Sequence, residues 1–304
     1  MTIREAKAAG MRFLAESSPT AALDTDCFLE FILDRPKSFL LAHSDGILTG
    51  EQAGALDECL RRRRTGLPVA YITGRKEFFG LDFEVNPSVL IPKPDTELLV
   101  EKAAEILAEK IHKRKDSILT VCDMCTGSGC VGISVISALL SSGTDGGILP
   151  AFTLADISPA ALETAKANAR KILGSKENLR IKFVQSNLFA SVPGKFDMIT
   201  ANPPYIPAAM TDGLLADGRC EPRLALDGDV TENGERAESG DGLEIIRRLV
   251  PQAKNHLAPY GILLMETGEY NAEAAAELAE RAGFRNVTVH RDLADQLRLV
   301  QASL

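Results

Sequence analysis

Side chains that bind metals or form disulfides are few in this chain of 304 residues. Its six cysteines lie mostly in apolar runs such as TVCDMC, which indicates reduced core residues and no disulfide framework. Cys122 and Cys125 form a C-x-x-C pair, but no second pair follows at the spacing of metal ligands. We therefore expect no metal site. Nor do we expect a catalytic histidine, because the four histidines are scattered without ligand spacing: His43, His112, His256 and His290.

Long apolar segments and an excess of positive charge are also absent. No run approaches the ~20 apolar residues that a membrane span requires, and the first residues, MTIREAKAAGMRFLAES, lack the apolar stretch of a secretion signal. Lysine and arginine number 34 against 42 for aspartate and glutamate, which gives a net charge of -8. An acidic protein gains nothing from the counterion release that drives nucleic-acid binding. These absences predict a soluble, cytoplasmic protein without a membrane partner or direct nucleic-acid contact.

The first part of the chain has the signals of short helices. Thr2 followed by Glu5, and Thr49 followed by Gln52, are capping boxes, and Pro19 is placed as a first-turn proline. We expect residues 1–73 to form a small helical domain. The segment FFGLDFEVNPSVL then alternates apolar and polar residues around a turn, so that residues 74–92 are predicted to be a β-hairpin linker.

From residue 93 to 304 long helices alternate with short apolar strands, which predicts a doubly wound α/β sheet that is mostly parallel. The last two strands are close together and suggest an antiparallel hairpin at the end. Residues 229–240, within DGDVTENGERAESGDG, are acidic and glycine-rich, and we expect a mobile loop there. The predicted helices are 96–114, 130–141, 159–173, 241–257 and 271–282; the predicted strands are 118–124, 152–156, 180–185, 196–202, 261–267, 286–292 and 297–302.

A glycine-rich loop, DMCTGSG, lies between the first predicted strand of this region and the next helix. Glycines there let the backbone pass close to a ligand that faces the helix N-terminus, as in nucleotide-type cofactor sites. Gly127, Gly129 and Gly132 also satisfy the G-x-G-x-x-G pattern of dinucleotide-binding oxidoreductases, and the loop alone does not separate the two classes. Asp156 ends the following strand, where a carboxylate can accept from both ribose hydroxyls of an adenosine, or cap the helix that opens at Ser158.

The tetrapeptide Asn202-Pro203-Pro204-Tyr205 follows the strand at 196–202, at the carboxyl end where open α/β sheets bind their ligands. An amide nitrogen is a poor nucleophile because its lone pair is delocalised. The Asn202 side-chain oxygen and the Pro203 carbonyl would accept its two N–H groups and present the lone pair to a methyl donor. The prolines stiffen the loop, and Tyr205 offers a flat face for stacking. No general base is required, because the methylated cation is a strong acid.

These motifs together resemble the release-factor glutamine methyltransferases over nearly the whole chain. NPPY alone is shared with adenine-N6 methyltransferases, whereas its combination with DMCTGSG, VLIPKPDTELLVE, EPRLALDG and METG is specific. The resemblance implies a Rossmann-like, seven-stranded class I methyltransferase domain at 93–304. It also implies methyl transfer from S-adenosylmethionine to the side-chain amide (N5) of the glutamine in the GGQ motif of class I peptide-chain release factors. The helical domain at 1–73 would dock the release factor.

The resemblance also assigns residues to roles. Asn202, Pro203, Pro204 and Tyr205 would hold the glutamine, and the cofactor would contact Cys125, Thr126, Gly127, Ser128, Gly129, Asp156, Asn187, Leu188 and Asn202. Three positions depart from the family: Cys125 replaces a usual glycine, Asn187 a usual acidic residue and Lys93 a usual arginine. Arg61 to Arg64 end a helix, where cations complement the dipole; we interpret them as solvated, with a partner-docking role as the alternative.

Three other functions stay open at this point. An adenine-N6 nucleic-acid methyltransferase would share NPPY, but the acidic composition does not favour it. An NAD-dependent oxidoreductase would share the glycine loop and leave NPPY unexplained. A non-enzymatic binding module would need a damaged loop or motif.

Overall fold

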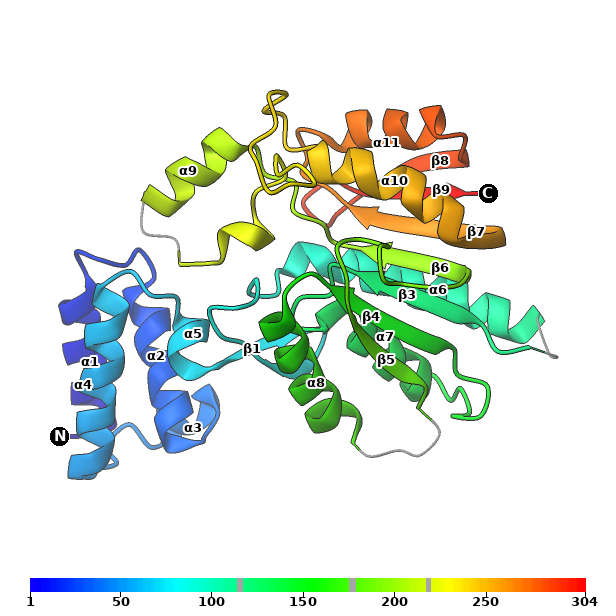
Figure 1. Ribbon diagram of the computed structural model, residues 1–304. Coiled ribbons are helices and arrows are strands. Elements are labelled where there is room, and N and C mark those ends of the chain that lie inside the picture. Colours follow the sequence, from blue (N-terminus) through cyan, green and yellow to red (C-terminus); the bar gives the residue numbers. More distant parts are fainter. Residues whose placement is uncertain (114–116, 175–178, 217–219) are drawn as a thin grey trace. The chain divides into compact units, whose positions relative to one another are not determined.

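The computed structural model describes residues 1–113, 117–174, 179–216 and 220–304 (Figure 1). The chain divides into two compact units. The first comprises Met1–Arg75 with Leu214–Cys220, and the second comprises Lys76–Gly213 with Glu221–Leu304. Among the described residues, no helix is both long enough and apolar enough to cross a membrane.

The first unit is helical, as predicted. Its helices are α1 (Ile3–Leu14), α2 (Ala21–Leu33), α3 (Lys37–Ala42), α4 (Gly50–Arg64) and α5 (Val69–Thr73). Both predicted capping boxes are present, at Thr2 and at Thr49. The role predicted for Pro19 was wrong: it precedes the N-cap residue Thr20, because α2 begins only at Ala21. The apolar faces enclose one core, which includes Leu14, Phe28, Leu29 and Leu56.

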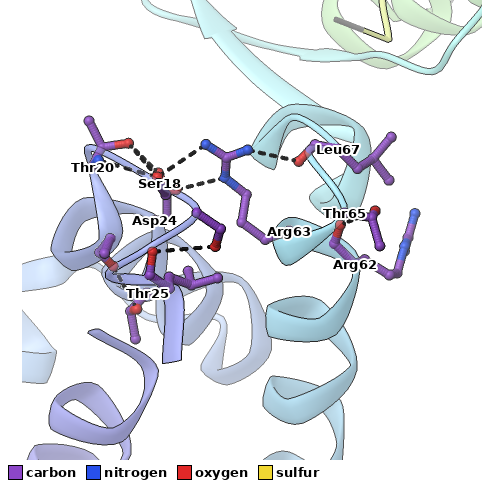
Figure 2. Close-up of polar contacts among 11 residues, drawn as sticks. Ser18, Thr20, Asp24, Thr25, Arg62, Arg63, Thr65 and Leu67 are labelled. Atoms are coloured by element: carbon purple, nitrogen blue, oxygen red, sulfur yellow. Dashed lines mark hydrogen bonds and ion pairs between the residues drawn. The ribbon is translucent and has the colours of Figure 1, made fainter. Parts of the chain in front are cut away.

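The interpretation of Arg61–Arg64 as solvated cations was wrong for one of the four. Arg61, Arg62 and Arg64 are exposed, whereas the Arg63 side chain is only 16% exposed. Figure 2 shows why: the Arg63 guanidinium donates from Nε to the Asp24 carboxylate (2.7 Å) and from Nη2 to the Ser18 hydroxyl (3.1 Å). The same carboxylate accepts from Ser18 Oγ at 2.6 Å, and Arg63 Nη1 donates to the Leu67 carbonyl at 3.4 Å. Arg63 therefore connects α4 to the start of α2.

Replacing Arg63 with alanine is expected to lower the free energy of unfolding of the first unit by about 2–3 kcal/mol, because it leaves the buried Asp24 carboxylate without its cation. Arg62→Ala is the matched control. Its side chain is exposed on the same turn, and its loss should change stability by less than ~0.5 kcal/mol. Urea denaturation followed by circular dichroism measures both. Equal, small effects for the two variants would contradict a stabilising role for the Arg63 contacts.

A two-stranded hairpin follows the helices, formed by β1 (Arg75–Phe78) and β2 (Leu81–Glu84). The hairpin is shorter than the one predicted from the alternation of apolar and polar residues over 78–90. The turn lies at Phe79 and Gly80, which both have positive φ angles (53° and 71°). The apolar residues after Glu84, including buried Val85 and Val89, belong to a loop instead.

The second unit contains the predicted seven-stranded α/β sheet, in the order β5-β4-β3-β6-β7-β9-β8. The first five strands of that order run parallel, and β9 pairs antiparallel with both β7 and β8, which confirms the fold class and the closing hairpin. The strands are β3 (Thr120–Met124), β4 (Ala151–Asp156), β5 (Ile181–Gln185), β6 (Phe196–Ala201), β7 (Leu257–Glu266), β8 (Arg285–Arg291) and β9 (Leu297–Ser303).

Two apolar layers cover the faces of this sheet. Alternate strand residues divide between them: Val121 and Met198 belong to the layer that includes residues of α6, α7 and α8, whereas Cys122 and Ile199 belong to the layer with α10 and α11 (Figure 1). Because helices cover both faces, we expect a ligand to bind at an end of the sheet. The helices and short 3-10 turns are η1 (Pro94–Thr96), α6 (Glu97–Lys113), α7 (Cys130–Ser141), α8 (Pro159–Leu173), α9 (Ala208–Ala216), η2 (Arg223–Ala225), α10 (Glu244–His256) and α11 (Ala272–Arg281).

Candidate functional site

A cavity of about 240 Å³ lies at the carboxyl ends of the parallel strands, entirely within the second unit. Segments that follow four neighbouring strands line it. These are the glycine loop after β3, Asp156 at the end of β4, Asn187 and Leu188 after β5, and Asn202 and Pro204 after β6. The structure thus brings together most residues that the sequence assigned to a cofactor or a substrate, because these strand ends share one edge of the sheet.

The glycine loop uses its glycines for two different purposes. Gly127 has a φ of 55° and open space where a Cβ would lie, so the backbone is exposed to the cavity. Gly129 does not line the cavity. Its φ is 81°, and a Cβ there would come within 2.7 Å of Ile133 and 3.2 Å of Ala165, so it allows α7 and α8 to pack closely. Cys125, Thr126 and Ser128 line the cavity with Gly127.

A buried carboxylate that the sequence did not single out holds this loop in place. Asp123 Oδ2 accepts from Thr126 Oγ1 at 2.5 Å and from the Gly132 N–H at 3.2 Å, while Oδ1 accepts from Thr200 Oγ1 at 2.8 Å. Burial raises the pKa of Asp123 to about 6, although these hydrogen bonds oppose the rise. Asp123 therefore ties β3 to the glycine loop, to α7 and to β6. A carboxylate inside the apolar run TVCDMC was the available signal.

The contacts of Asp156 bear on its two predicted roles, as an acceptor for ribose hydroxyls and as the cap of the following helix. The helix cap belongs to Ser158, whose Oγ accepts from the Ala161 N–H at 3.2 Å. Asp156 instead accepts from the Gly127 N–H (2.8 Å) through Oδ2 and from the Ser158 N–H (2.9 Å) through Oδ1. Each carboxylate oxygen has a second lone pair. Asp156 also lines the cavity, so the unused lone pairs are available to a pair of hydroxyls. Burial raises the pKa of this carboxyl, while its hydrogen bonds lower it.

Two residues on the cavity wall have left-handed backbone conformations. Cys125 has a φ of 59° and Leu188 a φ of 48°. Such angles favour glycine, which explains in physical terms why a glycine is usual at position 125 in the family that the sequence resembles. Burial raises the pKa of the Cys125 thiol far above its ordinary value, so the thiol stays protonated and acts as a small apolar side chain.

The residues of the NPPY segment divide between the cavity and its support. Asn202 and Pro204 line the cavity, whereas Pro203 and Tyr205 do not. Asn202 Nδ2 donates to Thr96 Oγ1 at 3.2 Å, and this bond orients the Asn202 amide. The Tyr205 hydroxyl donates to Glu266 Oε1 at 3.1 Å, and its carbonyl accepts from Asn271 Nδ2 at 3.0 Å. Tyr205 thus anchors the loop, and its ring is not part of the cavity wall as the predicted stacking role requires.

Close backbone approach also fixes this segment. A Cβ on Gly242 would lie 2.2 Å from the Tyr205 carbonyl oxygen, and one on Gly228 would lie 2.8 Å from the Tyr205 Cα. Asp229 is fully buried and accepts from the Ala208 N–H (2.8 Å) and from the Gly242 N–H (2.7 Å). The two ends of the acidic segment therefore hold the NPPY loop from the outside.

The acidic segment, residues 229–240, forms a loop as predicted, and hydrogen bonds close it into a turn. Its mobility stays a prediction. Val230 bridges Arg236, the Thr231 N–H donates to the Glu235 carbonyl at 2.8 Å, and Arg248 donates to the Val230 carbonyl at 2.8 Å. Hydrogen bonds of the backbone and of Arg248 thus close the turn. Its residues Val230, Thr231, Glu232 and Gly234 line the cavity.

Lys93, which lines the cavity, forms an ion pair with a buried carboxylate. Lys93 Nζ lies 2.8 Å from Glu221 Oε1, which also accepts from the Ile91 N–H at 3.3 Å. The lysine ammonium makes this single contact with the carboxylate, whereas the guanidinium of an arginine could bind both carboxylate oxygens. Within the described ranges, no three His, Cys, Asp or Glu side chains are grouped so that they could hold a metal ion.

Comparisons with known proteins agree with this geometry. Residues 5–74 match the family model described as the PrmC N-terminal domain, and residues 97–217 match the methyltransferase small domain. A release factor glutamine methyltransferase of Moorella thermoacetica is 37% identical over 98% of this chain and 97% of its own length. The one from Escherichia coli K12 is 33% identical over 93% of this chain and 92% of its own.

Among solved structures, the hMettl16 catalytic domain in complex with MAT2A 3'UTR hairpin 6 is 15% identical, with a TM-score of 0.52, over 84% of this chain and 81% of its own. That likeness reflects the fold. The release factor glutamine methyltransferases of Moorella thermoacetica and Escherichia coli, in contrast, match nearly the whole chain at 37% and 33% identity. The chain therefore belongs to the release factor glutamine methyltransferase family.

Proposed function

We propose that this protein transfers a methyl group from S-adenosylmethionine to the side-chain amide nitrogen of the glutamine in the GGQ motif of class I peptide-chain release factors. The observation that carries the proposal is the position of Asn202, which lines the cavity while its Nδ2 is already bonded to Thr96. Its remaining polar atom, Oδ1, is an acceptor, which is what the N–H group of a substrate amide requires.

The cavity fits S-adenosylmethionine, which supplies an electrophilic methyl group when bound. Asp156 has spare lone pairs for the two ribose hydroxyls. Asn187 and Leu188 line the part of the cavity after β5, where they would flank the adenine, and the exposed backbone of Gly127 permits close approach of the ligand. Cys125, Thr126 and Ser128 complete this wall. Of the other two residues in the predicted set, Asn202 lines the cavity, whereas Gly129 supports the site only through the packing of α7 and α8.

The residues of the chain act on the substrate amide by holding it. Asn202 Oδ1 would accept one N–H. The Pro203 carbonyl, which belongs to the peptide bond to the cavity-lining Pro204, would accept the other, so that the nitrogen lone pair faces the methyl group. Such orientation can lower the activation barrier by several kcal/mol. Pro204 restricts the loop, while Tyr205 anchors it through Glu266. Methyl transfer to the neutral amide nitrogen gives an N-methylated cation, which is a strong acid and releases its extra proton to water without a dedicated base.

The other functions are not favoured. An oxidoreductase would make no use of Asn202 and its bond to Thr96. An adenine-N6 nucleic-acid methyltransferase would share the amino-group clamp, yet the net charge of -8 opposes a nucleic-acid partner. A binding module would not need a cavity with both a nucleotide-type loop and an amide clamp. We infer that the partner is a release factor docked by the helical unit, residues 1–73.

The test is to incubate the protein with labelled S-adenosylmethionine and a purified class I release factor, and to locate the label by peptide mass spectrometry. We expect one methyl group on the GGQ glutamine. A release factor with that glutamine replaced by alanine is the control, and it should acquire no label. Labelling of the control, or labelling of added RNA or DNA in preference to the release factor, would contradict the proposal.

Asp156→Ala is expected to weaken the binding of S-adenosylmethionine at least tenfold, because two ribose hydroxyls lose a charged acceptor worth about 1.5–3 kcal/mol. Ser158→Ala is the control, since it removes the cap of α8 and costs about 1 kcal/mol of stability without removing a charge. Titration calorimetry and thermal unfolding of both variants separate the two effects. Unchanged affinity in Asp156→Ala would exclude the ribose role.

A further inference from the structure

Glu266 is a buried acidic residue that does not itself line the cavity. It ends β7, and the pairing of Ala201 with Met265 places it beside Asn202 at the edge of the sheet. Its relative exposure is 2%. Burying an ionised carboxylate destabilises the fold unless hydrogen-bond donors or cations compensate its charge.

Two hydroxyl groups face the Glu266 carboxyl. The Tyr205 hydroxyl donates to Oε1 at 3.1 Å, and the Thr96 hydroxyl is a second donor, close enough to lower the pKa of this carboxyl. Oε2 is buried and has no hydrogen-bond partner within the described part of the chain. Both hydroxyls thus converge on a group that, when ionised, can only accept.

The Thr96 hydroxyl connects Glu266 to the amide clamp. Thr96 is 2% exposed, and its Oγ1 accepts from Asn202 Nδ2 at 3.2 Å. A hydroxyl has one hydrogen to donate. If that hydrogen points to a carboxylate, the Thr96 oxygen has only lone pairs left for Asn202. The Asn202 group that faces Thr96 must then be the donor, its NH2 group. The Asn202 carbonyl oxygen is left facing the cavity.

We propose that Glu266 is the positioning residue of the amide clamp: it accepts the Thr96 hydroxyl proton and thereby fixes the orientation in which Asn202 presents its carbonyl oxygen to the substrate amide. The inference rests on the proposed function of Asn202. It also explains the METG motif, of which Glu266 is the acidic residue. Through Tyr205 the same carboxylate holds the other end of the NPPY segment.

Protonation of Glu266 reverses this chain of hydrogen bonds. A protonated carboxyl donates to Thr96, which then donates to Asn202, and the asparagine amide turns its NH2 group to the cavity, where it repels the substrate N–H. Burial raises the pKa of Glu266 to about 7, against the opposing effects of Thr96, Tyr205 and Arg298. The other charged or titratable groups that face it are Asp95 on η1 and the Cys130 thiol on α7.

The sign follows from that pKa. Below about pH 7 the carboxyl is neutral and the clamp is reversed, and above it the carboxyl is ionised and the clamp is correctly oriented. The single-turnover methylation rate of the wild-type protein should therefore rise between pH 6 and pH 8, with a midpoint close to that value.

The experiment compares the wild type with Glu266→Gln, Thr96→Val and Thr96→Ser. Each full-length protein is mixed with S-adenosylmethionine and a purified release factor in single-turnover reactions across this pH range. Glu266→Gln should react about tenfold more slowly at pH 8 and lose the rise with pH, with unchanged affinity for S-adenosylmethionine. Thr96→Val should be slowed equally, and the double variant no further. Thr96→Ser keeps the hydroxyl and should restore the rate.

A Glu266→Gln protein that reacts at the wild-type rate at pH 8, or that keeps the wild-type pH profile, would overturn the inference. So would an equal loss of S-adenosylmethionine affinity in that variant, which would indicate a general structural defect. If Glu266→Gln does not fold, the two Thr96 variants decide alone: a valine variant as fast as the serine variant would overturn the proposal. Failure of the wild type to methylate glutamine at all is a different result, since it would refute the proposed function itself.

Discussion

Replacing Asn202 with alanine is expected to slow single-turnover methylation of a release factor by a factor on the order of a hundred or more. The loss has a specific cause. Asn202 Oδ1 is the acceptor that remains after Nδ2 bonds to Thr96, and without it the substrate amide has only the Pro203 carbonyl to orient it. The interaction matters most in the transition state, so the rate should fall far more than the affinity for S-adenosylmethionine.

Asn202→Asp distinguishes the acceptor from the rest of the side chain. It keeps an acceptor of the same reach but loses the N–H that donates to Thr96, and it places a carboxylate near the buried Glu266. We expect rates in the order wild type, aspartate, alanine. Calorimetry with S-adenosylmethionine is the control for all three, and the affinities should agree closely. An alanine variant with nearly normal turnover would remove Asn202 from the mechanism.

The architecture of the second unit was predictable from the sequence because each element carries a local signal. Apolar strands such as FTLAD and FDMITA alternate with amphipathic helices, and that alternation determines a parallel sheet. Boundaries were less predictable. The strand expected at residues 261–267 begins at Leu257, because α10 ends at His256 and passes into β7 without any turn residue between them. The helix begins three residues later than expected, after Gly240 and Gly242.

The cavity was predictable for the same topological reason. Residues that follow parallel strands meet at one edge, so Gly127, Asp156, Asn187 and Asn202 lie around one cavity although they are far apart in the chain. The roles within the set depend on packing that no local pattern records. Gly129 serves helix packing, and Tyr205 serves as an anchor.

The residues that the sequence did not reveal are buried carboxylates: Asp123, Asp229 and Glu266. Their partners are distant in sequence, as in the bond between Asp123 and Thr200, 77 positions away, or between Glu266 and Tyr205, 61 positions away. A single acidic residue at the end of an apolar strand has no periodicity to mark it. Its role depends on which hydroxyls and N–H groups the fold places against it, and only the structure supplies that information.

Deletion of residues 1–73 is expected to leave a folded protein that binds S-adenosylmethionine normally but methylates intact release factor at least about a hundredfold less efficiently. Independent folding is expected because each unit has its own apolar core. The first core is drawn from residues between Ile3 and Ile72, and those of the second unit begin at Phe78. Every residue that lines the cavity lies after position 87, so the cofactor site stays complete.

The loss in efficiency follows from the proposed docking role. A substrate held by one part of a chain reaches the site of another at a high effective concentration, and losing that attachment lowers apparent affinity by a factor of about 10²–10⁴. A short peptide containing GGQ is the control, because it is too small to use a separate docking unit and should be methylated equally by both proteins. The measurement is kcat/KM for the release factor and for the peptide with the full-length and shortened chains. Equal values for the intact release factor would show that residues 1–73 do not dock it, whereas loss of activity on the peptide as well would assign them to the integrity of the active site.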